Sequence, residues 1–263
     1  MNIAANLSLL FTGLPLGERI AAAAAAGFDG VEVQFPYELP ATQFQEALER
    51  SGLPLVLFNL PAGDLMEGGA GLAAVPARQA EFDAALEQAL DYARQAPPLC
   101  INVLPGRRAA GVSREQALDT LVANLRKAAD AFQELGVTVL FEAINPLDMP
   151  GFLINTPAHL RQVLERVDHP NCQVQLDIYH MARHGIAPDL AIEQLSGAIG
   201  HVQFADYPGR GAPGTGSIPF DLMFKALAHF GYTGWLGAEY RSQDSGQDLA
   251  WLSYWRLQGV AGS

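Results

Sequence analysis

Short apolar runs alternate with longer stretches of mixed polarity along the whole chain. Several of the short runs contain few polar residues, which is typical of parallel strands that are covered on both faces. β-branched residues, which favour the pleated surface of a sheet, are frequent in them. We expect eight strands, over residues 2–8, 30–35, 54–60, 99–104, 137–143, 172–178, 200–206 and 234–240.

The stretches between the later strands show the periodicity of helices. In residues 76–95 and 114–135, apolar side chains recur at i, i+3, i+4 and i+7, which places them on one helix face. Ser113 and Gln116 have the spacing of a capping box ahead of the second stretch, and Thr156 before a proline is a helix start signal. Further helices are expected over residues 188–197, 219–230 and 247–257.

Eight strand–helix units predict an α/β fold, a single (β/α)8 TIM barrel that spans residues 1–263. Barrels of this kind typically need ~250 residues. The competing fold is a doubly wound open sheet, but the first strand is not followed by the GxGxxG fingerprint of such sheets. Two long loops, residues 61–77 and 206–219, follow strands, so we expect both at the carboxyl-terminal rim, where barrel active sites form.

The chain is acidic, with 28 Asp and Glu residues against 16 Lys and Arg residues and a formal net charge of −12. It has no cluster of basic residues, which argues against nucleic acid and anionic membranes as partners. The N-terminus lacks a basic region followed by an apolar stretch, so we expect a cytoplasmic protein. Cys100 and Cys172 lie in apolar runs without CxxC spacing, and we interpret them as small buried residues rather than as a disulfide.

Polar residues stand near the ends of four consecutive expected strands: Glu142, Asp177, Gln203 and Glu239. They are about one strand–helix unit apart, so a barrel brings them to neighbouring positions of one rim. Three carboxylates this close repel one another unless a cation lies between them. Oxygen ligands favour Mg²⁺ or Mn²⁺ over zinc, so the pattern predicts a site for a hard divalent metal. The alternative is that each carboxylate caps a helix or pairs with an arginine.

Long segments resemble the hydroxypyruvate isomerase family, which includes the 2-oxo-tetronate isomerases and lies within the xylose isomerase-like TIM barrel superfamily. The resemblance covers nearly the whole chain and is carried by NLSLLF (6–11), NLPAGD (59–64), FEAINPLDMPGF (141–152), QLDIYHMAR (175–183), GHVQFADYPGRGAPGTG (200–216) and GWLGAEY (234–240). It implies that the four strand-end residues hold the metal and that Glu142 and Glu239 are the acid/base pair. The chain departs from the family at Ala143, where Pro is usual, and at Phe58, where His is frequent and which we expect on the rim.

The reaction that the resemblance implies moves a carbonyl group between adjacent carbons of a small hydroxy-oxo acid, through an enediolate. An acid substrate needs a cation, and Arg210 offers a planar fork that matches a carboxylate. His180, which we expect in a loop, is a candidate donor to a substrate oxygen, and Asp148 is a candidate partner for a hydroxyl group. The alternatives are a packed or solvent-facing histidine, a solvated loop arginine and a turn aspartate.

Other functions compete with this interpretation. A ketose 3-epimerase needs the same two glutamates but no cation for an acid group. A metal-dependent nuclease needs a basic face and a His-rich zinc cluster, which a net charge of −12 and six His residues disfavour. A non-catalytic sugar-acid binding protein needs no opposed carboxylates. A homo-oligomer is possible through the apolar segment 249–257, although that segment can equally pack against the barrel's own helices.

Overall fold

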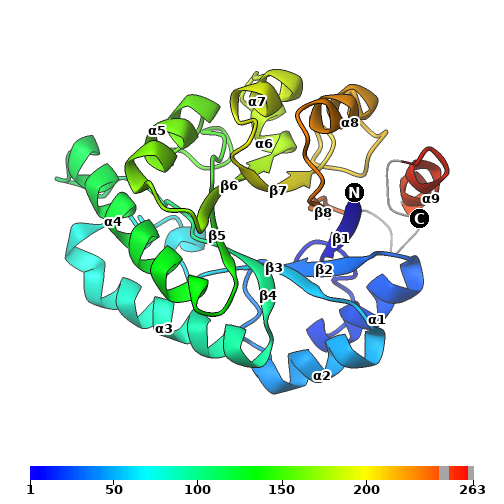
Figure 1. The fold of residues 1–263 in the computed structure, drawn as a ribbon, viewed down its shortest axis with the longest axis horizontal. Helices are drawn as coiled ribbons and strands as arrows, with labels where there is room; N and C mark the ends of the chain where they lie inside the picture. The colour runs from blue at the N-terminus through cyan, green and yellow to red at the C-terminus, as the bar shows by residue number, and fades with distance from the viewer. Residues whose placement is uncertain (243–248, 260–263) are drawn as a thin grey trace.

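The computed structural model describes residues 1–242 and 249–259. Eight parallel strands are hydrogen-bonded in sequential order and close into a barrel (Figure 1). The strands are β1 Asn2–Asn6, β2 Gly30–Val33, β3 Leu55–Asn59, β4 Pro98–Asn102, β5 Thr138–Glu142, β6 Cys172–Asp177, β7 Ile199–Phe204 and β8 Trp235–Ala238.

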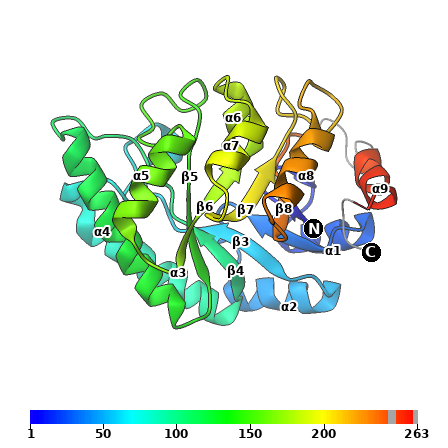
Figure 2. The ribbon, with the colours of Figure 1, turned by 45° about the horizontal axis from the view of Figure 1, so that its top comes forward.

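Helices follow the strands and form an outer ring around the barrel, as Figures 1 and 2 show. They are α1 Leu16–Ala26, α2 Ala41–Ser51, α3 Gln79–Gln95, α4 Arg114–Gln133, α5 Pro157–Val167, α6 Ile178–Arg183, α7 Pro188–Gln194, α8 Phe220–His229 and α9 Ala250–Leu257. Two short 3-10 turns, η1 Leu65–Glu67 and η2 Pro76–Arg78, lie in the long loop after β3.

The predicted (β/α)8 barrel is confirmed. β1 pairs with β8 from Asn2–Trp235 to Ala5–Ala238, so the sheet has no free edge and the doubly wound alternative is wrong. All eight expected strands are present, and each ends one or two residues earlier than the apolar pattern indicated.

The predicted helix starts are confirmed where the sequence carried a cap. Ser113 accepts from the Gln116 backbone N–H and the Gln116 side chain accepts from the Ser113 N–H, which completes the capping box of α4. Thr156 likewise caps α5. The expected helix at 76–95 begins with the 3-10 turn η2, and part of the one at 247–257 lies outside the described residues.

Two helices that the pattern did not single out are α1 and α2. α1 contains a run of six alanines, so its two faces differ little in polarity, although Leu16, Ile20 and Ala23 are buried. α6 was also missed, because Ile178 was expected in the preceding strand and His180 in a loop. Both expectations are wrong: the Asp177 side chain accepts from the Tyr179 and His180 N–H groups and starts a helix at Ile178.

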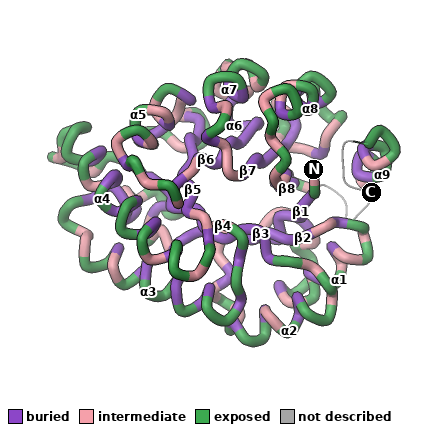
Figure 3. The backbone as a smooth tube through the Cα atoms, in the orientation of Figure 1, coloured by how far each residue is buried: buried purple, intermediate pink, exposed green. Residues whose placement is uncertain are grey.

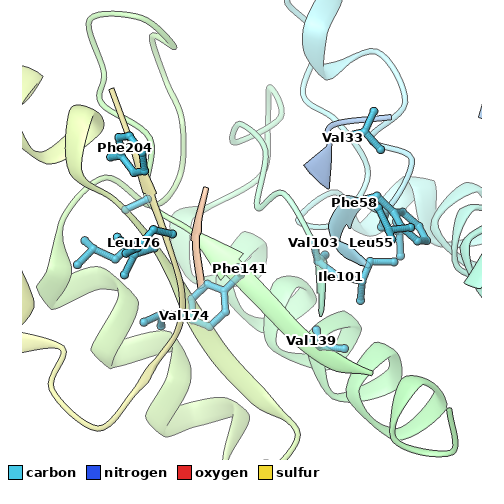
Figure 4. Close-up of a cluster of buried hydrophobic side chains, with 14 of the residues drawn as sticks. Val33, Leu55, Phe58, Ile101, Val103, Val139, Phe141, Val174, Leu176 and Phe204 are labelled. Atoms are coloured by element: carbon cyan, nitrogen blue, oxygen red, sulfur yellow. The ribbon is translucent and has the colours of Figure 1, made fainter. Parts of the chain in front are cut away.

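The main core lies between the barrel and the helix ring, where buried residues follow the strands and the inner faces of the helices (Figure 3). Figure 4 shows the aliphatic and aromatic side chains that several strands contribute to it. Inside the barrel, a smaller cluster contains Ala4, Leu57 and Leu140. Each of these precedes a polar residue by two positions on the same strand, so the barrel interior is apolar at one end and polar at the carboxyl-terminal end.

Phe58 is not on the rim, contrary to expectation. It is fully buried in β3 and packs edge-on against Tyr37 and Tyr92 outside the barrel. Cys172 is buried as expected, whereas Cys100 is only partly buried, contrary to expectation. Both are free thiols, in agreement with the expectation that they form no disulfide.

In α9, Trp251 and Trp255 are buried against Phe204, so the segment packs on its own barrel. Tyr254 and Leu257 of the same helix are exposed, and a subunit contact through them stays a prediction. Within the described ranges, no helix is long and apolar enough to cross a membrane.

Candidate active site

The four strand-end residues form a buried polar layer at the carboxyl-terminal end of the barrel. Glu142 and Asp177 are the last residues of β5 and β6, Gln203 lies in β7, and Glu239 directly follows β8. The register places Asp177 beside Gln203. All four side chains belong to residues that are buried. The barrel therefore brings together the residues that sequence spacing selected.

Glu142, Asp177 and His180 form the tightest group, because one potential ligand atom of each lies within 4.8 Å of the others. Glu239 joins this group through Arg210, whose Nη2 lies 2.9 Å from Glu239 Oε2 and 3.9 Å from Asp177 Oδ2. Two of the four residues therefore also have the structural partners that were weighed as alternatives: Asp177 caps α6 and Glu239 pairs with an arginine.

Gln203 lines the same cavity but is bonded elsewhere. Its Nε2 donates to Glu32 Oε1 at 2.7 Å and its Oε1 accepts from Gln175 Nε2 at 2.6 Å. Gln203 can therefore act as a metal ligand only through its carbonyl oxygen, which has to face the carboxylates in place of the NH₂ group.

Arg210 is held in place by its surroundings and is not a solvated loop residue. Its guanidinium lies 5.1 Å above the centre of the Tyr179 ring and its side chain is largely buried. The backbone of Arg210 has a φ of 54°, a conformation that residues other than glycine rarely adopt. Asp206 shapes this loop by accepting hydrogen bonds from backbone N–H groups at four positions between 207 and 218.

Burial makes the carboxylates of this layer hard to ionise. Burial, together with the charges of Glu239 and Asp177, raises the pKa of Glu142 to about 8. Burial also raises the pKa of Asp177 and that of Glu239, although Arg210 opposes both shifts. Glu142 has a neutral partner, Asn102, whose Nδ2 donates to Oε1 at 2.8 Å.

His180 is buried and neutral, because burial and the charge of Arg210 lower its pKa to about 3. Its Nδ1 lies 2.6 Å from Asn145 Nδ2. The Asn145 side-chain oxygen already accepts from the Leu147 and Asp148 N–H groups, so its NH₂ group must face the imidazole. Nδ1 is therefore the acceptor and Nε2 carries the proton. Nε2 lies 3.5 Å from Asp177 Oδ2, so His180 presents a donor, rather than a metal-binding lone pair, to the site.

Asp148 is at the edge of the same cavity, in the loop after β5. Its Oδ1 accepts from Arg183 Nε at 2.8 Å, and its Oδ2 accepts from Asn145 Nδ2 at 3.1 Å. Both of its oxygens thus have protein partners, and the carboxylate connects α6 to the loop that carries Asn145.

Several buried polar partners were missed by sequence reasoning. Gln34 Nε2 donates to Glu239 Oε1 at 2.6 Å, and Asn102 supports Glu142. Glu32 accepts from Gln203. The signal that could have found them is a polar residue inside an apolar strand, as in GVEVQF, where Glu32 and Gln34 alternate with valines and so share the inner face of β2.

The cavity above this layer has a volume of about 190 Å³. It is smaller than the ~300–1,000 Å³ of sites for drug-sized ligands, so it suits a small molecule. The charged residues of its lining are Glu142, Asp148, Glu239, Arg210 and Arg241. The apolar residues of its lining are Phe35, Leu57, Met66, Leu104, Ile144 and Met149.

The donor chemistry of the layer fits a hard divalent cation. Three carboxylates lie around the guanidinium of Arg210, and Gln175 Oε1 on the cavity wall is buried with no hydrogen-bond partner among the described residues. Oxygen-rich sets of this kind bind Mg²⁺ or Mn²⁺ rather than zinc.

Comparison with known proteins identifies the fold family. A sequence model of the family described as Xylose isomerase-like TIM barrel matches residues 20–255. The chain belongs to the xylose isomerase-like TIM barrel family. Within this family it is similar to hydroxypyruvate isomerase of Escherichia coli, at 38% identity over 257 residues, 97% of this chain and 100% of that protein. It is also similar to 2-oxo-tetronate isomerase of Haemophilus influenzae, at 36% identity over 90% of this chain and 92% of that protein.

These relatives confirm the resemblance that the sequence motifs carried, and the chain is an isomerase of the xylose isomerase-like family. A solved structure from Brucella melitensis, described as an AP endonuclease of family 2, has a TM-score of 0.91 and 38% identity and covers 97% of this chain and 99% of its own. D-Psicose 3-epimerase of Clostridium cellulolyticum has a TM-score of 0.79 at 20% identity, covering 95% of this chain and 89% of its own, and shares the fold.

Proposed function

We propose that the chain is a metal-dependent isomerase of a small hydroxy-oxo acid. The reaction converts hydroxypyruvate to tartronate semialdehyde, or a 2-oxo-tetronate to a 3-oxo-tetronate. The observation that carries the proposal is the buried guanidinium of Arg210, which lies 2.9 Å from Glu239 and lines one cavity of about 190 Å³ together with Glu239 and Glu142. The full-length similarity to hydroxypyruvate isomerase and 2-oxo-tetronate isomerase supports it.

The two glutamates account for the proton transfers. One of Glu142 and Glu239 takes the proton from the hydroxyl-bearing carbon, which leaves an enediolate. The other returns a proton to the neighbouring carbon, while the hydroxyl proton moves between the two oxygens, so that atoms and charge balance. Both carboxylates reach the cavity from different strands, as a substrate held between them requires.

The remaining residues bind and orient the acid. We assign the substrate carboxylate to Arg210, because a fork of N–H donors matches two oxygens. The Nε2–H group of His180 donates to a substrate oxygen where negative charge develops. Asp148 holds the loop of Asn145, which in turn fixes the His180 ring, and it lies within the cavity wall to contact a substrate hydroxyl.

Glu142, Asp177, Glu239 and Gln203 would hold the metal, with Mg²⁺ or Mn²⁺ as the matching ions. When bound, such an ion supplies Lewis-acid stabilisation for the oxygens of the enediolate.

A ketose 3-epimerase is the second candidate, because it uses the same pair of glutamates. The buried Arg210 favours the acid substrate, since its guanidinium on the cavity wall offers a substrate carboxylate a matching partner that a neutral sugar does not need. A nuclease is disfavoured by the net charge of −12 and by a cluster built from carboxylates rather than from several histidines. A non-catalytic binding protein has no use for two opposed carboxylates.

The deciding experiment is a proton-NMR assay of the metal-loaded protein against hydroxypyruvate, 2-oxo-tetronates and ketohexoses. We expect turnover of an acid, its loss after chelation, and its recovery with Mg²⁺ or Mn²⁺. Turnover of ketohexoses alone would establish the epimerase, and full activity in metal-free protein, verified by elemental analysis, would exclude the metal.

A further inference from the structure

Glu32 of β2 is fully buried inside the barrel and lies below the cavity rather than in its wall. Its Oε1 accepts from Asn6 Nδ2 at 2.9 Å and from Gln203 Nε2 at 2.7 Å, and its Oε2 accepts from His201 Nε2 at 2.7 Å. A buried carboxylate is costly unless its oxygens are hydrogen-bonded, so these three donors explain how the fold tolerates it.

The barrel makes room for this carboxylate at Gly237 of β8. A Cβ atom at position 237 would lie 2.3 Å from Glu32 Oε2, well inside van der Waals contact. The backbone of Gly237 is not in the left-handed region that favours glycine. Position 237 is therefore glycine because a side chain there would collide with Glu32, and not because the backbone forms a turn.

The contact with Glu32 decides how the amide of Gln203 is oriented. Both oxygens of Glu32 accept hydrogen bonds, Oε1 from Asn6 and Oε2 from His201, so the carboxylate faces Gln203 as an acceptor and selects the NH₂ group of the amide. The carbonyl oxygen of Gln203 must then point away from Glu32, and there it accepts from Gln175 Nε2 at 2.6 Å. A carbonyl oxygen has two lone pairs, so Oε1 keeps one for a further partner.

We infer that Glu32 is a positioning residue that turns the carbonyl oxygen of Gln203, rather than its NH₂ group, toward the metal-binding carboxylates. The inference rests on the proposed function, because it requires a metal and Gln203 as one of its ligands. Without the fixed carboxylate, the Gln203 amide is free to turn by half a rotation and present donors that repel a cation. Partners outside the ligand shell commonly act on a metal in this way.

The neighbouring position on β2 supports this role. Gln34, two residues after Glu32 on the same face, donates to Glu239 Oε1 at 2.6 Å. Glu32 of β2 thus supplies a fixed partner to a predicted ligand on β7, and Gln34, directly after β2, supplies one to a predicted ligand directly after β8. A purely structural role for Glu32, which would only satisfy Asn6 and His201, does not require this alignment with Gln203.

The test is Mn²⁺ binding by titration calorimetry in the absence of substrate. In Glu32→Gln the amide oxygen of the new side chain keeps the hydrogen bond from His201. The new NH₂ group then faces Gln203, and the Gln203 amide has to turn over to accept from it. We expect Mn²⁺ affinity to fall by about 10–100-fold, the usual effect of losing such a partner. Glu46→Gln, the same change at a surface glutamate that pairs with Arg50, is the matched control and should leave the affinity unchanged.

Two further variants separate positioning from general stability. In a Gln203→Ala background, adding Glu32→Gln should weaken Mn²⁺ binding no further, because the residue that Glu32 orients is gone. The exchanged pair E32Q/Q203E keeps the hydrogen bond and the total charge, and a carboxylate at 203 offers oxygen in either orientation. It should restore binding to at least the wild-type level, and it serves as the test if Glu32→Gln alone does not fold.

The outcomes separate this inference from the proposed function. If Glu32→Gln binds Mn²⁺ normally while Gln203→Ala does not, or if the exchanged pair binds as weakly as Glu32→Gln, the inference is wrong and the metal site stands. If Gln203→Ala binds normally while chelation still abolishes turnover, the inference is again wrong and the isomerase stands. If the wild-type protein binds neither Mn²⁺ nor Mg²⁺, both are wrong.

Discussion

Asp177 serves two partners at once. One of its oxygens accepts from the N–H groups that start α6, while the other lies 3.5 Å from His180 Nε2. Helix capping and participation in a polar site are therefore not exclusive. The cap fixes the carboxylate in a single position, and this fixed position lets it share the cluster with Glu142 and His180.

At Arg210 we predict a loss of substrate binding. Arg210→Ala removes a charge-assisted contact, which is typically worth about 1.5–3 kcal/mol, or roughly 10–150-fold in affinity. The Michaelis constant for the acid substrate should rise by this factor. Arg94→Ala, at an exposed ion pair with Asp91 on α3, is the control and should have no effect. An unchanged Michaelis constant in Arg210→Ala would show that another group holds the acid.

At the two glutamates we predict a loss of turnover with metal retained. Glu142→Gln and Glu239→Gln keep an oxygen ligand but cannot exchange a proton, so turnover should fall by the ~10²–10⁴-fold of general acid–base catalysis. The variant that lacks the abstracting base should stop exchange of the carbon-bound hydrogen with deuterated solvent. Asp177→Asn should act mainly by weakening metal binding, so excess metal should restore part of its activity. Near-normal turnover in either glutamine variant with metal bound would rule out a two-carboxylate mechanism.

At the scale of elements, the strands were predictable and the contacts between them were not. The apolar runs predicted all eight strands, and the polar residues at the ends of β5 to β8 predicted which side chains meet in the buried polar layer. The partners Gln34 and Asn102 come from strands far away in the sequence, so no local pattern links them to Glu239 and Glu142. Likewise, the β-branched Ile178 favoured a strand, and only the cap by Asp177 starts a helix there.

For α4 we predict a measurable cost of removing its cap. Ser113→Ala leaves the Gln116 N–H group without its side-chain acceptor, and a lost N-cap typically costs about 0.5–2 kcal/mol. The free energy of unfolding, measured with denaturant, should fall by this amount. Thr42→Ala, at an exposed position of α2, removes a hydroxyl outside any cap and should change it by less than ~0.5 kcal/mol. Equal effects in both variants would contradict the capping assignment.

At the scale of the whole molecule, the buried carboxylates make the stability of the metal-free protein depend on pH. The pKa of Glu142 is raised from 4.5 to about 8, so the folded state keeps a proton that the unfolded state releases, and stability falls as pH rises through this range. The pKa of His180 is lowered from 6.5 to about 3, so His180 costs stability only below pH 6.5. Between pH 6.5 and 8 His180 therefore adds nothing to the pH dependence, and the effect of Glu142 remains.

We therefore expect the unfolding temperature of the chelated protein to fall as pH rises from 6.5 to 8, measured by scanning calorimetry. Saturating Mn²⁺ should reverse the trend, because a metal binds the ionised carboxylates and stabilises the state that it binds. The slope should flatten in Glu142→Gln, which has no proton to lose there. A stability that rises with pH in the chelated protein would contradict the assignment.

Part of the cavity lining comes from strands that carry none of the residues assigned to the chemistry. Those residues lie at the ends of β5 to β8 or in the loops that follow, whereas the apolar Phe35, Met66 and Leu104 follow β2, β3 and β4. The apolar side chains have no hydrogen bonds to lose, so exchanging them leaves the acid/base pair and its partners intact. An engineer could therefore vary substrate length and selectivity with a library restricted to positions 66 and 104, and duplicated copies of this gene could diverge in substrate by the same route while the reaction stayed the same.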